Sequence, residues 1–252
     1  MNAVLGIDIG GSGIKGAPVD LATGEFVADR LRIETPKKST PENVADVVGQ
    51  IVDHFADTIG DGPVGITIPA VVTHGRTRSA ANIDKGWVDF EAEKMFREHL
   101  GRQVLLMNDA DAAGICEAHY GAAKDQPGLV LLATLGTGIG SALIQDGVLI
   151  PNSEFGHLEM NGGDAEQQAS SGAKEREGLS YKQWIPIIEQ YFQMVEGLIW
   201  PDLIVVGGGI SKDAHKFLPH LRLKSKIVPA EHRNKAGIIG AARLASQNPD
   251  GM

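Results

Sequence analysis

Residues 4–16 read VLGIDIGGSGIKG and constrain the fold more than any other segment. An apolar run with Asp8 near its end leads into a turn, and a second extended segment starts at Ile14. The turn residues are Gly10, Gly11, Ser12 and Gly13. Glycine has no Cβ, so backbone N–H groups can approach a phosphate closely, and successive N–H groups form a concave anion site. The segment predicts a strand–turn–strand phosphate loop.

The charges on either side of the turn favour this interpretation over the alternative, an ordinary hairpin with a glycine-rich turn. Asp8 precedes the glycines and is suited to hold a magnesium ion through water. Lys15 follows them and adds a point positive charge.

Composition limits the classes of function. A chain of 252 residues can bury a full core, as one large domain or two small lobes. The net charge of −9 argues against a general nucleic-acid binder. Cys116 is the single cysteine, which excludes an internal disulfide and a Cys-based zinc cluster. We expect it to be a small buried residue.

Targeting signals are not apparent. The N-terminus starts directly with a predicted strand, and no apolar run approaches the ~18 residues of a membrane span. We therefore expect a cytoplasmic protein that does not bind membranes.

Strands alternate with helices along the chain, which predicts an α/β fold. Expected strands are 3–9, 17–21, 64–68, 104–107, 129–134, 141–145 and 203–206. Expected helices are 42–56, 90–100, 110–120, 181–199 and 236–246.

An internal repeat is indicated by residues 132–147, LATLGTGIGSALIQDG, which repeat the design of strand, glycine turn and returning strand. Two such loops predict two related lobes that face each other across a cleft. We expect residues 1–112 plus helix 236–248 to form a small phosphate-loop lobe, and residues 113–235 a large lobe with the second loop.

Two further glycine turns are phosphate-binding candidates. Gly136, Thr137 and Gly138 form the second cradle, although a strand rather than a helix follows them, unlike in a dinucleotide-binding fold. Gly207, Gly208 and Gly209 follow a strand and are expected to open a helix, whose N-terminus suits the distal part of a phosphoryl donor or a nucleoside. A plain strand-to-helix turn is an equal alternative for this third turn.

Residues 106–113, LMNDADAA, put an amide and two carboxylates where a strand ends and a helix starts. Ligands of α/β proteins bind at such strand ends. Asp109 is suited to accept a proton from a substrate hydroxyl, whereas Asp111 is expected to be structural. The alternative is a helix cap, which explains one carboxylate but not the whole set.

A second polar cluster follows in residues 154–159, EFGHLE, and 164–166, DAE. Carboxylates and a neutral His157 suit the vicinal hydroxyls of a sugar. A metal site is disfavoured because no second His lies at i+4 and no Cys is near, and a solvated loop remains the alternative for Glu159.

Taken together, these motifs resemble the ROK family of sugar kinases, within the actin/hexokinase-like (ribonuclease H-like) superfamily. The resemblance covers nearly the whole chain. It implies a first phosphate loop at Asp8, Gly10, Gly11, Ser12 and Lys15 and a second at Gly136, Thr137 and Gly138. It also implies a general base at Asp109 and sugar contacts at Asn82, Asn108, Asp109, Glu154, His157 and Glu166.

Two departures from the family pattern are informative. Most members carry a Cys-rich zinc motif after the His, but residues 158–165 contain no Cys, so no structural zinc is expected. Pro69 is followed by Ala70 where the family often has Gly, so we carry over no sugar contact there.

The short zinc-free form, with AANIDKGW at 80–87 and NSEFGHLEM at 152–160, resembles the actinobacterial members that use inorganic polyphosphate. This implies phosphorylation of glucose, and of mannose, at the 6-hydroxyl, with polyphosphate, ATP or both as donor, Mg²⁺ as cofactor and a homodimer as the assembly. Candidates for a basic polyphosphate track are Lys15, Lys85, Arg102, Lys124, Lys174 and Arg176.

Three alternatives remain: a strictly ATP-dependent kinase for hexoses or N-acetylhexosamines, a non-catalytic sugar-responsive regulator, and a phosphate-chain hydrolase. The regulators of the family carry a DNA-binding module before the first loop, for which this sequence leaves no room before Asp8. The sugar cluster argues against the hydrolase.

Overall fold

A computed structural model describes residues 3–80 and 83–247. The chain divides into two compact units, residues 1–116 with 235–252 and residues 117–234, and the division falls inside helix α4 (Asp109–Tyr120). The lobes predicted from the sequence, with the roles assigned to them, stay predictions.

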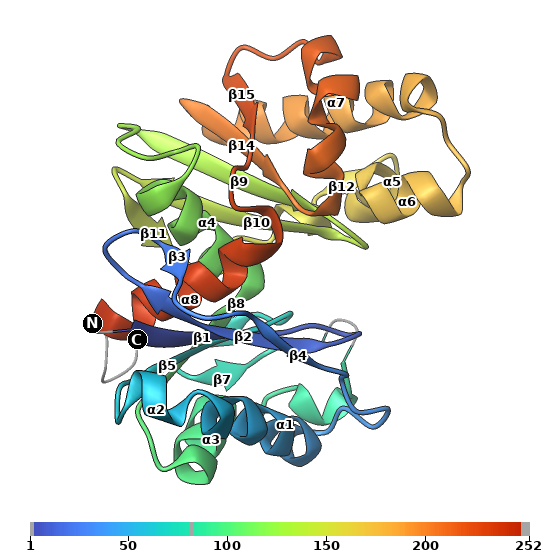
Figure 1. The fold of residues 1–252 in the computed structure, drawn as a ribbon. Coiled ribbons are helices and arrows are strands. Elements are labelled where there is room, and N and C mark those ends of the chain that lie inside the picture. The colour runs from blue at the N-terminus through green and yellow to red at the C-terminus, as the bar shows by residue number, and fades with distance from the viewer. Residues whose placement is uncertain (1–2, 81–82, 248–252) are drawn as a thin grey trace. The chain divides into compact units, whose positions relative to one another are not determined.

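The first unit is built on a sheet with the strand order β3-β2-β1-β5-β8, and β4 also pairs with β2 (Figure 1). Its first strand is antiparallel to β2 and parallel to β5, which is parallel to β8. The strands are β1 (Ala3–Ile9), β2 (Ile14–Asp20), β3 (Glu25–Phe26), β4 (Leu31–Ile33), β5 (Val64–Ile68) and β8 (Val104–Asn108). A separate hairpin consists of β6 (Val72–Thr73) and β7 (Arg76–Thr77).

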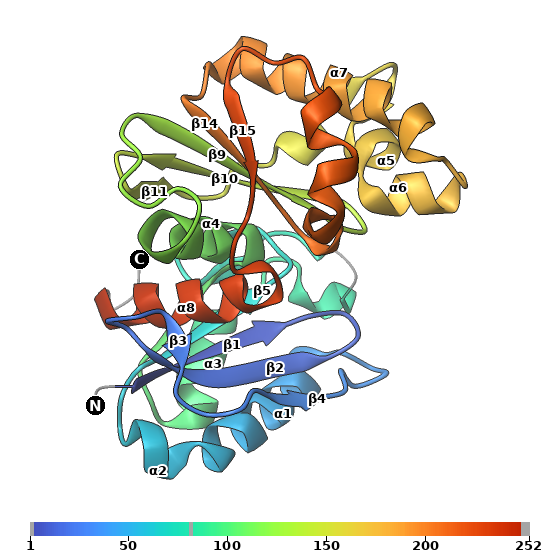
Figure 2. The ribbon, with the colours of Figure 1, turned by 45° about the horizontal axis from the view of Figure 1, so that its top comes forward.

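The second unit repeats this arrangement with the order β11-β10-β9-β14-β15 (Figure 2). Here too a hairpin leads into strands that run parallel to its first strand. The strands are β9 (Leu129–Leu135), β10 (Ile139–Gln145), β11 (Val148–Ile150), β14 (Leu203–Gly207) and β15 (Lys226–Pro229). The repeat seen in the two glycine turns thus extends to the strand order of both sheets.

Alternation along β1 separates the two faces of the first sheet. Leu5, Ile7 and Ile9 belong to a core with the apolar stripe of α1. On the other face Gly6 lies opposite Gly65 of β5, and a Cβ at either position would be about 2 Å from a carbonyl of α8. These glycines therefore allow α8 to lie directly on the sheet. The helices of this unit are α1 (Pro41–His54), α2 (Ala56–Ile59), η1 (Lys85–Trp87), α3 (Ala92–Leu100), η5 (Arg233–Lys235, starting in the second unit) and α8 (Ala236–Gln247).

Local signals explain where the main helices start. The Thr40 side chain accepts the N–H of Asn43 before Pro41 opens α1. In the second unit Ser180 and Gln183 form a capping box at the start of α7 (Tyr181–Ile199). Trp184, Ile188 and Phe192 on that helix join the core of the second sheet. The other short elements of this unit are η2 (Phe155–His157), β12 (Glu159–Met160), β13 (Gly163–Asp164), α5 (Glu166–Ala169), α6 (Ser171–Arg176), η3 (Gly209–Lys216) and η4 (Leu218–His220).

The expected elements match the structure closely, with α7 over the predicted residues and β2 three residues longer at its start. Several short elements were not predicted: the strands β3, β4, β6, β7, β11, β12, β13 and β15 and the helices α2, α5 and α6. These strands are short and lie at sheet edges, where the apolar pattern is weakest. No described helix has the length and apolarity needed to cross a membrane.

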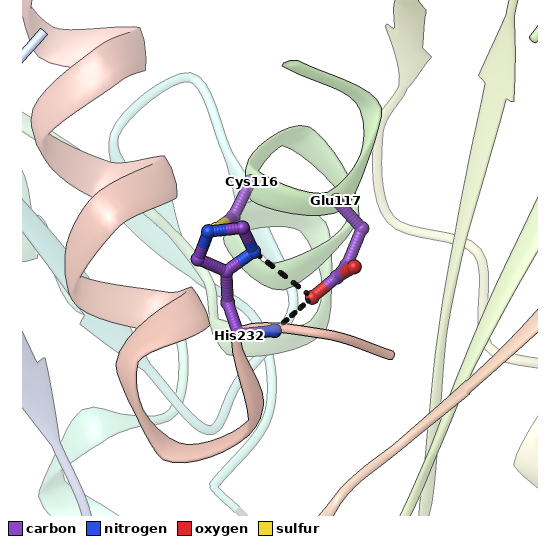
Figure 3. A group of neighbouring side chains, drawn as sticks. All are labelled: Cys116, Glu117 and His232. Carbon is purple, nitrogen blue, oxygen red and sulfur yellow. Dashed lines mark hydrogen bonds and ion pairs between the residues drawn. The ribbon is translucent and has the colours of Figure 1, made fainter. Parts of the chain in front are cut away.

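Glu117 of α4 is a buried carboxylate, shown beside His232 in Figure 3, that holds two separate backbone segments of the second unit. Its Oε2 accepts the N–H groups of Ala122 at 2.9 Å and of Glu231 at 3.1 Å, and its Oε1 accepts the N–H of His232 at 2.8 Å. The His232 ring nitrogen Nδ1 lies 3.5 Å from the same Oε1. The carboxylate therefore connects the end of α4 to the segment that follows β15.

Replacing Glu117 by alanine should destabilise the second unit, because three backbone N–H groups lose a charged acceptor. We expect a loss of about 3 kcal/mol and a melting temperature lower by roughly 5–10 °C. Glu175→Ala, on the exposed side of α6, is the matched control and should melt like the wild type. Equal melting of both variants, measured by calorimetry, would contradict this role of Glu117.

Candidate functional site

The first glycine turn closes the β1–β2 hairpin between Ile9 and Ile14. The carbonyl oxygen of Gly10 accepts the hydroxyl of Thr35 at 2.5 Å, and that of Ser12 accepts the guanidinium of Arg32 at 2.7 Å. In a trans peptide unit the next N–H points opposite to the carbonyl. The N–H groups of Gly11 and Gly13 therefore point away from the side chains that hold the loop, as an anion cradle needs.

Asp8 and Lys15 lie opposite each other in the hairpin register. The Lys15 ammonium is 3.4 Å from Oδ2 of Asp8, and Oδ1 accepts the hydroxyl of Thr67 at 3.0 Å. The carboxylate is partly exposed, and oxygen is the donor that Mg²⁺ prefers. One partly exposed carboxylate beside the first glycine turn fits a hydrated magnesium ion.

The second turn, Gly136–Gly138, has the same construction in the other unit. The Gly136 carbonyl accepts the N–H of Gly172 at 2.8 Å and the hydroxyl of Ser171 at 2.9 Å. The Thr137 carbonyl accepts the hydroxyl of Ser170 at 3.1 Å. By the same peptide geometry, the N–H groups of Thr137 and Gly138 point away from the start of α6.

Asn108 and Asp109 stand where β8 ends and α4 begins. The Asn108 Oδ1 accepts the N–H groups of Ala110 at 2.7 Å and Asp111 at 3.2 Å, and its Nδ2 donates to the carbonyl of Ala70 at 3.2 Å. Asn108 is buried, and its side chain caps the first turn of α4. The cap considered above for an aspartate is therefore provided by this asparagine. Asp109 is exposed, and its Oδ1 accepts the N–H of Ala110 at 2.9 Å.

Residues Glu154–His157 are held against β10. Ser141 of that strand donates its hydroxyl to the Ser153 carbonyl and accepts the N–H of Phe155 at 3.0 Å. A Cβ on Gly156 would lie 2.3 Å from the Ile139 carbonyl, so the glycine permits this close approach. The motif is therefore seated on the strand that follows the second glycine turn.

Asp164 and Glu166 lie beside the two polar side chains of this motif, Glu154 and His157. His157 Nε2 is 3.9 Å from Glu154 Oε2, and its Nδ1 is 3.2 Å from Asp164 Oδ2. Glu166 Oε2 accepts the Ile139 N–H at 3.0 Å, directly after the glycine turn. The three groups of His157, Asp164 and Glu166 each place a ligand atom within 4.8 Å of the others, the spacing of a potential cation site. The second unit thus brings Glu154, His157 and Glu166 together, and Asp164 joins them.

The third glycine turn opens a helix, as expected. Gly208 has φ 80°, and the helix that follows, η3, is of the 3-10 type with a kink at Asp213. A Cβ on Gly208 would lie 2.4 Å from the Leu135 carbonyl, so close packing on β9 accounts for this glycine. A donor contact at Gly207–Gly209 stays a prediction, and Asn82 lies outside the described residues.

The basic candidates have various partners. Lys174 lies over the Tyr181 ring at 4.5 Å, Arg102 donates to the Gly60 carbonyl, and Arg176 donates to the Gln167 carbonyl at 2.6 Å. Arg32 is not among the site residues predicted from the sequence; its guanidinium donates to the Ser12 carbonyl of the first glycine turn, and the residue lies opposite Lys15 in the β2–β4 register. The sequence places Asp164 in the second polar cluster but assigns it no role of its own.

Comparison with known proteins decides the family. The family model described as "ROK family" matches residues 4–176. The chain belongs to the ROK family.

Two relatives are similar over nearly the whole chain. The polyphosphate glucokinase of Mycobacterium tuberculosis is 50% identical over 238 residues, 94% of this chain and 89% of that protein. The crystal structure of the inorganic polyphosphate/ATP-glucomannokinase from Arthrobacter sp. strain KM is 48% identical, covers 98% of this chain and 100% of its own, and superposes with a TM-score of 0.93.

The fold also extends to more distant members of the family. A ROK glucokinase from Streptomyces griseus, solved with glucose and AMPPNP, is 23% identical and has a TM-score of 0.82, with 97% of this chain and 99% of that chain covered. These likenesses confirm the actin/hexokinase-like α/β fold.

The carboxyl of Glu154 has an unusual environment for a surface loop. Burial raises its pKa above 4.5, the nearby His157 opposes the rise, and the charge of Glu166 adds to it. A raised pKa in the folded state means that this group favours folding below pH 4.5, and that this contribution is lost as the pH rises through the folded value.

Glu154→Gln should therefore melt at a slightly higher temperature than the wild type at pH 7–8, by ~1–2 °C. The difference should vanish at pH 4, where the wild-type carboxyl is protonated. Glu159→Gln, at an exposed position on β12, serves as control. A difference that stays constant from pH 4 to pH 8 would show that Glu154 pays no desolvation cost.

Proposed function

We propose that this ROK protein transfers a phosphoryl group to the 6-hydroxyl of glucose, and of mannose, from inorganic polyphosphate or ATP. The observation that carries the proposal is the pair of glycine turns built alike. In each, side chains hold the carbonyl groups and the N–H groups point the other way. The 50% identity to a polyphosphate glucokinase supports the donor and the acceptor.

Phosphoryl transfer asks a protein mainly for positioning and for stabilisation of spreading negative charge. The N–H groups of Gly11, Gly13, Thr137 and Gly138 supply that stabilisation to the phosphate chain. Lys15 adds a cation, and Arg32 a second one on the neighbouring strand.

Asp109 acts as the general base. It is exposed at the carboxyl end of a buried strand and takes the proton of the 6-hydroxyl as that oxygen attacks phosphorus. Asn108 holds the first turn of α4 and so fixes the position of its neighbour. Asn82 is proposed as a further sugar contact.

Glu154, His157 and Glu166 hold the sugar through directional hydrogen bonds with its hydroxyls. Glu166 accepts the N–H of Ile139, so this sugar-binding residue and the second phosphate loop form one rigid group. This link relates the position of the sugar to that of the donor.

Magnesium would be held near Asp8, together with donor phosphates and water. When bound, it offsets the charge that develops on the transferring group. The assembly as a homodimer and a cytoplasmic location are part of the proposal.

The first experiment measures sugar 6-phosphate formed from glucose with Mg²⁺, comparing nucleotide-free polyphosphate with ATP. We expect product from polyphosphate alone. Product from ATP only would reject the polyphosphate donor and keep the kinase. No product from either donor, with glucose and mannose, would reject the sugar kinase activity.

Asp109→Asn should lower kcat by roughly 10²–10⁴-fold, because an amide cannot take the proton. The amide oxygen still accepts the N–H of Ala110, so the fold and glucose affinity should be kept. Asp57→Asn, another exposed aspartate in the first turn of a helix, is the control and should turn over normally. Wild-type turnover in Asp109→Asn would refute the base assignment.

A further inference from the structure

His157 has a carboxylate on each side of its ring, at different distances. Nδ1 is 3.2 Å from Asp164 Oδ2, within hydrogen-bond range, whereas Nε2 is 3.9 Å from Glu154 Oε2, beyond it. A neutral imidazole carries one proton, and the stronger acceptor contact decides which nitrogen holds it. The geometry therefore favours the proton on Nδ1.

We propose that Asp164 is a positioning residue that holds His157 in the Nδ1–H tautomer and orients its ring. Nε2 is then a hydrogen-bond acceptor on the side of Glu154. This inference rests on the proposed function, because it assigns the acceptor nitrogen to a hydroxyl of the bound sugar. Asp164 itself touches no substrate and acts through the ring.

A rigid hairpin delivers the Asp164 carboxylate to the ring. Strands β12 and β13 pair Glu159 with Asp164 and Met160 with Gly163. The two turn residues, Asn161 and Gly162, both have positive φ, at 53° and 86°, as tight hairpins require.

Further contacts hold this hairpin to the rest of the unit. Met160 is buried in the core, and its carbonyl accepts the side-chain amide of Gln168 on α5. The N–H of Ala165 donates to the carbonyl of Leu158 at 2.9 Å. Asp164 is therefore fixed from both ends, although its carboxylate is partly exposed.

The position of Asp164 also relates the ring to Glu166. The two carboxylates are two residues apart, and Glu166 is held by the N–H of Ile139. With the ring proton directed to Asp164, the remaining groups of the motif are all acceptors: Glu154, Nε2 of His157 and Glu166. These three acceptors suit sugar hydroxyl groups that donate hydrogen bonds.

The tautomer can be read directly by long-range ¹H–¹⁵N correlation on protein labelled at histidine, at pH 8 and without sugar. His157→Gln assigns the signal. We expect a protonated Nδ1 and an unprotonated Nε2 in the wild type, and the opposite or a mixture in Asp164→Ala. Asp164→Asn, whose amide oxygen still accepts the Nδ1 proton, should keep more of the wild-type signal.

Glu159→Ala is the matched control, because it removes an exposed carboxylate from the residue that lies opposite Asp164 in the hairpin register. It should leave the His157 tautomer and the glucose KM unchanged. This separates a role for the Asp164 carboxylate from a general loss of hairpin stability.

Kinetics provide the second measurement. Asp164→Ala should raise the glucose KM by roughly threefold to tenfold, the value of one hydrogen bond, with kcat nearly unchanged. In a His157→Gln background, Asp164→Ala should cause no further increase in the glucose KM. Additive effects of the two substitutions would overturn the proposal.

A proton on Nε2 in the wild type would also overturn it. So would a stoichiometric metal ion, measured by elemental analysis, whose chelation changes the His157 signal, because the metal would then hold Nδ1. If the wild type does not phosphorylate glucose, the proposed function fails, and the NMR result still decides the relation of Asp164 to the ring.

Discussion

The structure depends first on what holds the carbonyl groups of its two glycine turns. A turn of glycine and serine has many conformations, and ordering it costs entropy. Here Thr35 and Arg32 hold the first turn, and Ser170, Ser171 and Gly172 hold the second. Because each peptide unit is rigid, holding its oxygen also aims the next N–H. The N–H groups of both turns are thus held in place before any ligand arrives.

The same strand order in both units explains why this device occurs twice. In each unit the first strand, β1 or β9, pairs with an antiparallel hairpin partner on one side and with a parallel strand on the other. Parallel strands align their carboxyl ends, which is where α/β proteins present functional groups. In the first unit that edge carries Asp109, and in the second Glu166 is tied to the strand that leaves the turn.

Much of this could be predicted from local sequence, and the remainder has a physical reason. The glycine turns, the capping of α1 by Thr40 and the apolar stripe of that helix are local patterns, so they appear in the sequence. The partners of the turns are not local: Thr35 lies 25 residues from Gly10, and Ser170 lies 33 residues from Thr137. Gly6 and Gly65 reveal their role only once α8 returns from the far end of the chain. Gly208 likewise reveals its role only in the fold, where a Cβ would meet the Leu135 carbonyl of β9.

The polar cluster of the second unit places His157 between two carboxylates, those of Glu154 and Asp164. A carboxylate on a tight hairpin can fix an imidazole ring by accepting one proton, and it adds negative charge beside Glu166. Burial and the charge of Glu166 raise the pKa of Glu154, and the carboxylates of the cluster together disfavour anionic ligands. A neutral polyol offers what such a cluster lacks, hydroxyl protons to donate, and brings no charge of its own. The electrostatics of the cluster therefore select the class of ligand, and the positions of its acceptors select among the members of that class.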